Sequence, residues 1–385
     1  MFNFDFYNPT QILFGQGQIA AIGQLLPPGA RILMTYGGGS IRKNGVYDEV
    51  RGALAGHTVI EFGGIETNPT FETLMEAVQL VKHEKIDFLL AVGGGSVIDG
   101  TKFIAAAALH EGEPWDLLEN NGKTIEAALP FATILTLPAT GSEMNGSAVI
   151  TREASQEKRW FTSRKVYPAF SVLDPSTTFT LPLRQVGNGV IEAFAHVMEQ
   201  YLTYPVNSAL QDRFAEGILQ TLIEEGPRAL ANPDDYDVRA NVMWSATMAM
   251  NGLIGAGVPQ DWSAHAIGLQ LTSLYELDHA QTMAVLLPSM MRIRRDAKRA
   301  KLLQYAARIW NLDGGDENGR IEGAIVRTEF FIRHMGLKTS LADYGLDHGS
   351  IDAVLAALEA HGMTALGEQR DVTLEVSRKV LEMSL

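Results

Sequence analysis

A glutamate and three histidines stand at spacings that suit one divalent metal ion. Glu192 and His196 are four residues apart in GNGVIEAFAHVMEQ, and His265 and His279 follow later in the chain. Residues i and i+4 share one face of a helix, so the first pair can hold one ion together. Imidazole suits Zn²⁺, Fe²⁺ or Ni²⁺, and such an ion can polarise a carbonyl group. The bland alternative is that these histidines are ordinary core or surface residues.

Two glycine turns, each reading Gly-Gly-Gly-Ser, follow apolar segments that we expect to be buried strands. The first turn covers residues 37–40 and the second covers residues 93–96. Glycine brings backbone N–H groups close to a pyrophosphate, and a helix after the second turn would add the positive end of its dipole. Asp99, one turn into that helix, would face ribose hydroxyls or the nicotinamide. The alternative is a tight strand-to-helix turn that needs glycine for its geometry alone.

The first turn also bears on which dinucleotide would bind. An enzyme that prefers NAD usually places a carboxylate after an early strand, where it binds the ribose 2′-hydroxyl and repels a 2′-phosphate. After RILMTY the sequence reads GGGSIRK without an acid, and Ser40, Arg42 and Lys43 would accept a phosphate. The sequence therefore favours NADP(H).

The segments that carry these residues differ in pattern along the chain. In the first part, β-rich runs such as RILMTY, HTVIEF and FATILTL alternate with helical stretches, which is typical of a parallel sheet covered by helices. From LPLRQVGNG onward, helical periodicity dominates. We therefore predict an α/β dinucleotide-binding domain with a parallel sheet over residues 1–180 and an all-α, metal-binding domain over residues 181–385. Asp261 and Asp278 are expected to cap the helices that carry the last two histidines.

Bulk composition limits the class of protein. The 385 residues carry 45 acidic and 31 basic side chains, a net charge of −14. A nucleic-acid partner is therefore not expected, because phosphate neutralisation needs clustered Lys and Arg. No apolar run approaches the roughly 20 residues needed to cross a bilayer, and MFNFDFYNPTQ lacks the basic start of a signal peptide. Cysteine is absent, which leaves nitrogen and oxygen as metal ligands and makes the cytoplasm the expected compartment.

Taken in order, several segments resemble the iron-containing (group III) alcohol dehydrogenases, most closely the bacterial NADP-dependent branch of aldehyde reductases and butanol dehydrogenases. The resemblance covers essentially the whole chain and runs through QILFGQGQI, GGIETNPT, AVGGGSVIDGTKFIAA, TLPATGSE, LDPSTTFTLP, GNGVIEAFAHVMEQY, NGLIGAGVPQDW and LDHAQTMAVLLP. It implies a metal-dependent enzyme that transfers a hydride between NADPH and short-chain aldehydes, with Fe²⁺ or Zn²⁺ as the metal. It also implies a homodimer, with QILFG at the interface.

Carried over by position, the resemblance assigns both sets of ligands. The metal ligands fall on Glu192, His196, His265 and His279. The cofactor contacts fall on Gly37, Gly38, Ser40, Asn68, Gly94, Gly95, Ser96, Asp99, Thr136, Thr140, Ser147 and Lys158. NAD-using relatives tend to carry Asp near the position of Gly38, which again favours NADP(H). No general acid is evident, so catalysis is expected to centre on the metal.

Two positions depart from the family pattern. The family usually has Asp where this chain has Glu192, whose longer side chain would change the affinity or the identity of the metal. A second histidine commonly stands four residues after the ligand at 265, where this chain has Leu269. Three readings of Leu269 are open: a proton reaches the product through water and ribose hydroxyls, activity on some substrates is weaker, or the leucine only widens an apolar pocket.

Two other functions are open at this point. A lyase similar to dehydroquinate synthase shares the fold, the nucleotide and a Glu/His/His metal site, but GVIEAFAHVMEQ offers no Lys or Arg for the phosphate and carboxylate of its substrate. A catalytically silent binder of metal and nucleotide is the second alternative, because of Glu192 and Leu269. Apolar residues expected near the site favour small aldehydes over sugar phosphates, unless they belong to the core: Phe194, Trp262, Ile267 and Leu269.

Overall fold

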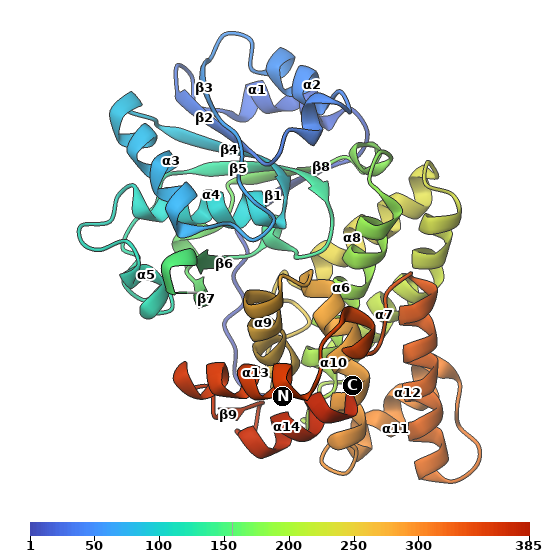
Figure 1. The fold of residues 1–385 in the computed structure, drawn as a ribbon. Helices are drawn as coiled ribbons and strands as arrows, with labels where there is room; N and C mark the ends of the chain where they lie inside the picture. The colour runs from blue at the N-terminus through green and yellow to red at the C-terminus, as the bar shows by residue number, and fades with distance from the viewer. Residues whose placement is uncertain (156) are drawn as a thin grey trace. The chain divides into compact units, whose positions relative to one another are not determined.

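The computed structural model describes residues 1–155 and 157–385, which divide into two compact units (Figure 1). Unit 1 comprises Met1–Phe6, Pro182–Asn232 and Met248–Leu385, and unit 2 comprises Tyr7–Leu181 and Pro233–Thr247. The functional domains expected at residues 1–180 and 181–385 stay a prediction. The units differ from those ranges in two segments that cross over, Met1–Phe6 and Pro233–Thr247.

Among the described residues, unit 2 contains a six-stranded parallel sheet, which confirms the predicted α/β fold. Its strands, in the spatial order β1-β8-β5-β4-β2-β3, are β1 (Gln11–Phe14), β2 (Arg31–Tyr36), β3 (Thr58–Phe62), β4 (Phe88–Gly94), β5 (Phe131–Leu137) and β8 (Phe170–Leu173). A separate antiparallel pair is formed by β6 (Ser147–Arg152) and β7 (Glu157–Thr162).

Most helices of unit 2 connect these strands along the chain, whereas η6 and α8 follow the last strand, β8. The α-helices are α1 (Ile22–Leu25), α2 (Val46–Ala53), α3 (Phe71–Glu84), α4 (Gly95–Ala107), α5 (Asp116–Glu119) and most of α8 (Tyr236–Ala249). The short 3-10 helices are η1 (Gln18–Ala21), η2 (Ser40–Arg42), η3 (Ser142–Met144), η4 (Glu153–Ser155), η5 (Arg164–Val166) and η6 (Pro175–Thr178).

Both faces of the sheet are buried, and alternate residues of each strand contribute to two separate cores. On β2, Ile32 and Met34 join the core that includes α1 and α2, whereas Leu33 joins the core that includes α3 and α4. These helix pairs lie on opposite faces of the sheet in Figure 1. Strands buried on both faces read as continuous apolar runs, which is why the sequence predicts them well.

The strand order changes direction between β2 and β4. From β2 the chain adds β3 on one side and then crosses over to add β4, β5 and β8 on the other side. In open α/β sheets, ligands bind outside the carboxyl ends of the strands at such a switch point. The two glycine turns follow β2 and β4, so the fold places both of them there.

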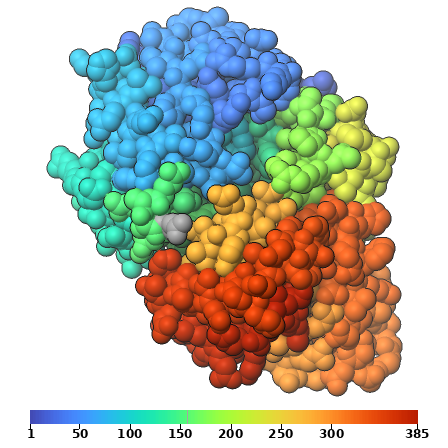
Figure 2. All heavy atoms as spheres, in the orientation of Figure 1, coloured from blue at the N-terminus to red at the C-terminus, as the bar shows by residue number. Residues whose placement is uncertain are grey.

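Unit 1 is helix-rich, as predicted. Its helices are α6 (Leu183–Tyr201), α7 (Ala209–Ala231), α9 (Ser263–Tyr275), α10 (His279–Ile293), α11 (Arg299–Trp310), α12 (Glu317–His334), η7 (Ala342–Tyr344), α13 (His348–Ala360) and α14 (Leu374–Met383). A short antiparallel pair, β9 (Ala365–Leu366) with β10 (Val372–Thr373), lies between α13 and α14 and adds to the predicted all-α pattern. Within the described ranges no helix is long and apolar enough to cross a membrane. The C-terminal helices, coloured orange to red, form one continuous surface in Figure 2.

The helices that carry the predicted metal ligands begin at different kinds of cap. Helix α10 begins directly after Asp278, whose backbone N donates to the side chain of Gln281 at 3.0 Å, so the predicted Asp278 cap is confirmed. Helix α9 begins at Ser263, and its N-cap residue is Trp262 rather than the predicted Asp261. Asp261 still accepts a hydrogen bond from the backbone N of Ser263 at 3.0 Å. The prediction for α9 was therefore wrong by one residue.

Candidate metal centre and nucleotide site

The three predicted histidine ligands lie together in unit 1, although they come from three helices. His196 lies in the C-terminal half of α6, His265 in the first turn of α9, and His279 is the first residue of α10. The ring centroids of His196 and His265 are 4.9 Å apart, and those of His265 and His279 are 5.0 Å apart. The packing of α10 against both α6 and α9 brings these side chains together.

Glu192 lies one helical turn before His196 on α6 and is partly buried. Residues four apart share a helix face, so its carboxylate stands on the same side of α6 as the imidazole. Within the described part of the chain, no group of three or more His, Asp or Glu side chains already has the arrangement of a metal site. The four-ligand centre therefore stays a prediction.

One atom of this cluster indicates that a cation would fit. Nε2 of His265 is buried and has no hydrogen-bond partner among the described residues, whereas Nδ1 of the same ring is hydrogen-bonded to Glu199. A buried polar atom without a partner costs about 1–3 kcal/mol. Coordination of a divalent cation by Nε2 would offset this cost, and the neighbouring imidazoles are ligands that Zn²⁺ and Fe²⁺ accept. The residues present therefore fit a divalent metal.

Glu199 is a member of this cluster that the sequence patterns did not predict. It lies three residues after His196 on α6, and it is 4% exposed. Its carboxylate accepts hydrogen bonds from the backbone N of Ala264 at 2.8 Å and of His265 at 3.2 Å. The signal available in the sequence was spacing alone, since Glu192, His196 and Glu199 stand on one face of α6.

The apolar residues expected near the metal fall into two groups. Phe194 and Ile267 are fully buried, and Phe194 packs against Phe331 with ring centroids 5.3 Å apart. These two side chains belong to the core of unit 1. Trp262 contacts the histidine cluster, with its ring edge-on to that of His265 at 5.1 Å. Leu269 lies one turn after His265 on α9 and is buried.

The first glycine turn leaves open space beside its glycines. Gly38 has a φ outside the left-handed region, and a Cβ built on it would meet nothing within 4 Å. Gly39 requires glycine for its backbone, because its φ is +88°. A Cβ at Gly37 would lie 3.2 Å from the carbonyl oxygen of Ile65. Neither packing nor backbone geometry requires glycine at position 38, and the close approach of a cofactor there stays a prediction.

The second glycine turn is tightly packed. A Cβ at Gly93 would lie 2.6 Å from Val97, and one at Gly95 would lie 2.4 Å from Thr140. Gly94 ends β4 at a register shift, and α4 begins directly after it, as predicted. Packing within unit 2 therefore requires glycine here, while the start of α4 still offers the positive end of its dipole to an anion.

Three more predicted cofactor contacts lie close to the second turn. Ser96 donates a hydrogen bond to the carbonyl oxygen of Thr67. The neighbouring Asn68 accepts a hydrogen bond from Nζ of Lys158 at 2.9 Å. These bonds connect the segment before α3 to the start of α4 and to β7.

The remaining predicted contacts lie on or after β5: Thr136 on β5 itself, Thr140 in the loop after it, and Ser147 at the start of β6. Thr136 is buried near the carboxyl end of β5, and Thr140 packs against Gly95. Ser147 hydrogen-bonds through its hydroxyl to Thr162 at 2.6 Å. All the predicted cofactor contacts thus belong to unit 2, and their contact with a cofactor stays a prediction.

A buried lysine and a partly buried aspartate lie beside the second turn, and the sequence predicted only the aspartate. Nζ of Lys102 donates to Ser142 at 2.7 Å and to Asn145 at 3.0 Å. Asp99 accepts hydrogen bonds from Ser142 at 2.5 Å and from the backbone N of Val149 at 2.9 Å. Burial lowers the pKa of Lys102 to about 8 and raises the pKa of Asp99. In this structure the pair fixes the segment that follows β5.

Glu61 stands near the first turn, although no acid follows β2 in the sequence. It comes from the end of β3 and accepts a hydrogen bond from Arg42 at 2.7 Å. Arg42 also donates to the hydroxyl of Tyr36 at 2.7 Å and lies 4.1 Å from the centre of the Tyr47 ring. Arg42, which the sequence predicts as a phosphate ligand, is thus held by a neighbouring carboxylate. Its contact with a phosphate stays a prediction.

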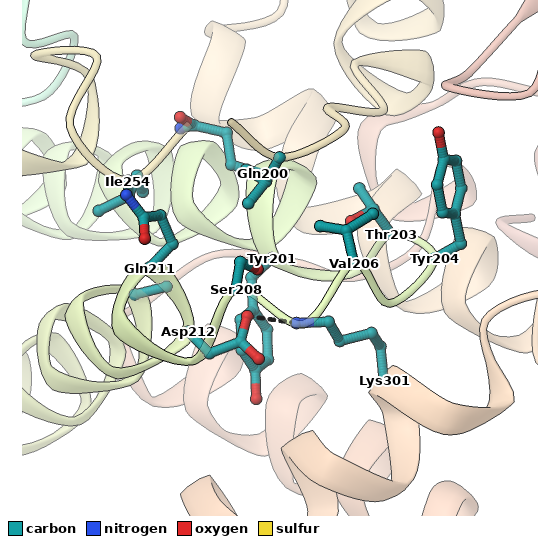
Figure 3. Close-up of a pocket in the computed structure, with 12 residues that line it drawn as sticks. Gln200, Tyr201, Thr203, Tyr204, Val206, Ser208, Gln211, Asp212, Ile254 and Lys301 are labelled. Carbon is teal, nitrogen blue, oxygen red and sulfur yellow. Dashed lines mark hydrogen bonds and ion pairs between the residues drawn. The ribbon is translucent and has the colours of Figure 1, made fainter. Parts of the chain in front are cut away.

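Two cavities of unit 1 hold none of the predicted metal ligands. The smaller one, about 10 Å³, lies beside the end of α6, and among its lining residues Asp212 and Lys301 form an ion pair (Figure 3). It has room for about one water molecule and is too small for a substrate. The larger one, about 640 Å³, is lined by residues that include Leu183, Leu230 and Leu337. Its volume is that of a small-molecule site.

A parallel sheet with glycine turns at its switch point and a helical unit with clustered histidines fit a dehydrogenase, one of the classes that the sequence left open. Sequence models agree with this class over nearly the whole chain. The iron-containing alcohol dehydrogenase domain matches residues 9–175, and the C-terminal domain of the Fe-containing alcohol dehydrogenase family matches residues 187–380. The chain therefore belongs to the iron-containing alcohol dehydrogenase family, and the resemblance found in the sequence is confirmed.

Individual relatives match the chain from end to end. The NADPH-dependent aldehyde reductase YqhD of Escherichia coli (strain K12) is 58% identical over 384 residues, which cover 99% of each protein. The probable NADH-dependent butanol dehydrogenase 1 of Bacillus subtilis (strain 168) is 38% identical, and the match covers 100% of both chains. The crystal structure of E. coli K-12 YqhD has a TM-score of 0.99 at 57% identity, with 100% of this chain and 99% of that chain covered.

Proposed function

We propose that this protein is a metal-dependent oxidoreductase that transfers a hydride between NADPH and short-chain aldehydes, and that it oxidises alcohols in the reverse direction. The observation that carries the proposal is the cluster of His196, His265 and His279, in which Nε2 of His265 is buried without a hydrogen-bond partner among the described residues. Family membership favours an oxidoreductase over a lyase similar to dehydroquinate synthase. The 58% identity to a protein named as an NADPH-dependent aldehyde reductase supports aldehydes as the substrate class.

The metal would be held by four side chains of unit 1, namely Glu192, His196, His265 and His279. When bound, a divalent ion supplies a Lewis acid that polarises a carbonyl group and stabilises negative charge on its oxygen. The family name supports Fe²⁺, and Zn²⁺ is the alternative that the same ligands accept. Trp262, edge-on to His265, presents an apolar surface that favours small apolar aldehydes over sugar phosphates.

NADP(H) is the proposed cofactor because of the first glycine turn. The open space beside Gly38 has room for a 2′-phosphate, and the one carboxylate that the fold brings near, Glu61, is paired with Arg42. A carboxylate directly after β2 would repel the phosphate, and the sequence GGGSIRK has none there. The E. coli relative is named as an NADPH-dependent enzyme, which supports the same choice of cofactor.

The proposal extends to a cytoplasmic homodimer. The absence of cysteine supports a reducing compartment. The start of the chain exposes three large aromatic side chains, with Phe2 at 50%, Phe4 at 53% and Phe6 at 45%. Strand β1 lies at an edge of the sheet, and its Phe14 is 39% exposed. Exposed apolar patches of this kind often mark protein–protein contacts, so these residues support an interface at this part of the chain.

Metal add-back is the experiment that tests the proposed function. The protein is stripped of metal with a chelator, and Fe²⁺ or Zn²⁺ is then added back. The oxidation of NADPH in the presence of butanal is followed by absorbance, and elemental analysis measures the bound metal. We expect oxidation only with metal, and a loss of roughly 1000-fold in His265→Ala, since several kcal/mol of transition-state stabilisation correspond to such a factor. His334→Ala is the matched control, because His334 lies at the exposed end of α12, and its activity should be unchanged.

Two outcomes would contradict the proposal in different ways. A protein that binds the metal and NADPH but oxidises no NADPH with any aldehyde would be the silent binder. A preference for NADH over NADPH would overturn the cofactor assignment and leave the oxidoreductase in place.

A further inference from the structure

The carboxylate of Glu199 contacts both the start of α9 and the ring of His265. Oε1 accepts a hydrogen bond from the backbone N of Ala264 at 2.8 Å, and Oε2 accepts one from the backbone N of His265 at 3.2 Å. Oε2 is also hydrogen-bonded to Nδ1 of His265. Glu199 is buried, with an exposed fraction of 4%, and the side chain of His265 is 13% exposed. One buried side chain thus serves a helix end and an imidazole at the same time.

The hydrogen bond to Nδ1 determines which nitrogen of His265 carries the hydrogen. An ionised carboxylate can only accept, so Nδ1 must donate, and in a neutral imidazole the lone pair then stands on Nε2. Nε2 is the buried atom that has no hydrogen-bond partner among the described residues. A metal-bound histidine commonly donates its other ring N–H to a carboxylate, which fixes the orientation of the ring.

We propose that Glu199 is a positioning residue for the metal centre: it holds His265 in the tautomer and orientation that present Nε2 to a divalent cation. This inference rests on the proposed function, because it takes His265 to be a metal ligand. Glu199 does not touch the cation or the substrate, and it acts through the imidazole and through the first N–H groups of α9.

The loop that leads into α9 is tied to the same turn of α6, which keeps Glu199 in place. The carbonyl oxygen of Glu199 accepts a hydrogen bond from the backbone N of Asp261 at 2.9 Å. The side chain of Asp261 forms a buried ion pair with Lys298, which also donates to the carbonyl oxygen of Leu202 at 2.6 Å. Trp262 then adopts a left-handed φ of 59° before α9 begins. The position of α9 relative to α6 is therefore fixed by bonds on both sides of Glu199.

The competing explanation is that Glu199 only caps α9. The N-cap residue of α9, Trp262, makes no side-chain hydrogen bond to the helix, so a carboxylate from α6 is a substitute for a local cap. A cap alone would stabilise the metal-free and the metal-bound protein equally. A positioning residue would stabilise the metal-bound protein more, and this difference can be measured.

The test is the variant Glu199→Gln, with the metal alone as the probe. Its amide oxygen can still accept from a backbone N–H of α9, but its NH₂ group donates to Nδ1 and thereby favours hydrogen on Nε2, where a cation cannot bind. We expect the dissociation constant for Zn²⁺, measured by competition with a chromogenic chelator, to rise by roughly 10- to 100-fold. The increase in Tm on addition of Zn²⁺ should shrink in parallel.

Glu216→Gln is the matched control. Glu216 is also a buried glutamate of unit 1, at 4% exposed, and it lies on α7, where it accepts hydrogen bonds from Tyr201 at 3.0 Å and Arg308 at 2.8 Å. Its variant should bind Zn²⁺ as the wild type does. If Glu199→Gln also binds Zn²⁺ with unchanged affinity, the positioning role is overturned while the proposed function stands. If the wild type itself binds neither Zn²⁺ nor Fe²⁺, the proposed function and this inference are overturned together.

A second measurement needs no stable variant at position 199. Long-range ¹H–¹⁵N NMR of ¹⁵N-histidine protein without metal reports the tautomer of each ring, and the spectrum of His265→Ala assigns the signal. We expect hydrogen on Nδ1 of His265. Hydrogen on Nε2 in the wild type would overturn the inference even if Glu199→Gln failed to fold.

Discussion

The two glycine turns of unit 2 have the same sequence, Gly-Gly-Gly-Ser, but different physical reasons for their glycines. At the second turn the space is filled, and a Cβ on Gly95 would lie 2.4 Å from Thr140. At the first turn a Cβ on Gly38 would meet nothing within 4 Å. The letters of the sequence could not distinguish these two situations.

The difference teaches how to interpret a glycine near a nucleotide site. A glycine that packing already requires gives no information about a ligand, whereas a glycine in open space with an ordinary φ leaves room for one. Gly52 and Gly217 share that property with Gly38, so open space alone does not indicate a ligand. By this criterion the second turn sets the geometry between β4 and α4. At the first turn, Gly38 is the position at which the proposed choice of dinucleotide can be tested.

The largest effect is expected at the packed turn. Gly95→Ala brings a Cβ against Cγ2 and Oγ1 of Thr140 and should lower the free energy of unfolding by about 1–3 kcal/mol, the usual range for overpacking. Urea unfolding measures the change. Adding Thr140→Ala to this variant removes the two nearest opposing atoms, Cγ2 and Oγ1, and should restore part of the loss. An unchanged free energy of unfolding in Gly95→Ala would show that the second turn is no more packed than the first.

A smaller effect, on binding rather than folding, is expected at the open turn. Gly38→Asp should shift the ratio of the NADPH and NADH dissociation constants by roughly tenfold toward NADH, because a carboxylate repels the 2′-phosphate and accepts from the 2′-hydroxyl. Isothermal titration measures both constants. The control is Gly38→Asn, which has the same shape without the charge. An equal shift of the ratio in both variants would mean that the size of the side chain, and not its charge, changes the cofactor preference. The argument for NADP(H) from the open space at Gly38 would then be wrong.

The last comparison, which includes the smallest effect, is between two neighbours within the first turn. Gly39→Ala should cost about 1–2 kcal/mol of stability, because its φ of +88° is strained for a residue with a Cβ. Gly38→Ala should stay within about 0.5 kcal/mol of the wild type. Thermal unfolding of the pair checks this order. An equal loss in both would indicate that position 38 also has a structural reason for glycine.

Local sequence patterns predicted most of the fold, because the start and end of most strands and helices depend on residues next to them in the sequence. Apolar runs bounded by glycine indicated β2, β4 and the start of α4, and Asp278 marked the start of α10. The cap of α9 was misplaced by one residue at Asp261: Asp261 accepts from Ser263, but the next two N–H groups of the helix bond to Glu199 of α6. A cap supplied by a distant helix leaves no signal next to the helix that it caps.

The residues of the candidate site also divide into those that local sequence patterns predict and those that depend on tertiary packing. Glu192 and His196 could be paired from their spacing on one helix. The approach of His265 to His196 depends on how three helices pack, so the sequence supplied it only through the family resemblance. Glu61 was missed for a related reason, since it reaches the first turn from the adjacent strand β3.

Pro233–Thr247 belongs to unit 2 although it follows a segment of unit 1 in the sequence, and this limits the order in which the units can fold. During synthesis this piece leaves the ribosome only after Pro182–Asn232 of the other unit. Until then the fully buried carboxylate of Glu143 lacks the hydroxyl of Thr247 that donates to it, and Met243 is missing from the core. A fragment that stops at Leu181 would lack Thr247 and Met243 permanently, so the α/β unit is complete only after residues 233–247 have been made.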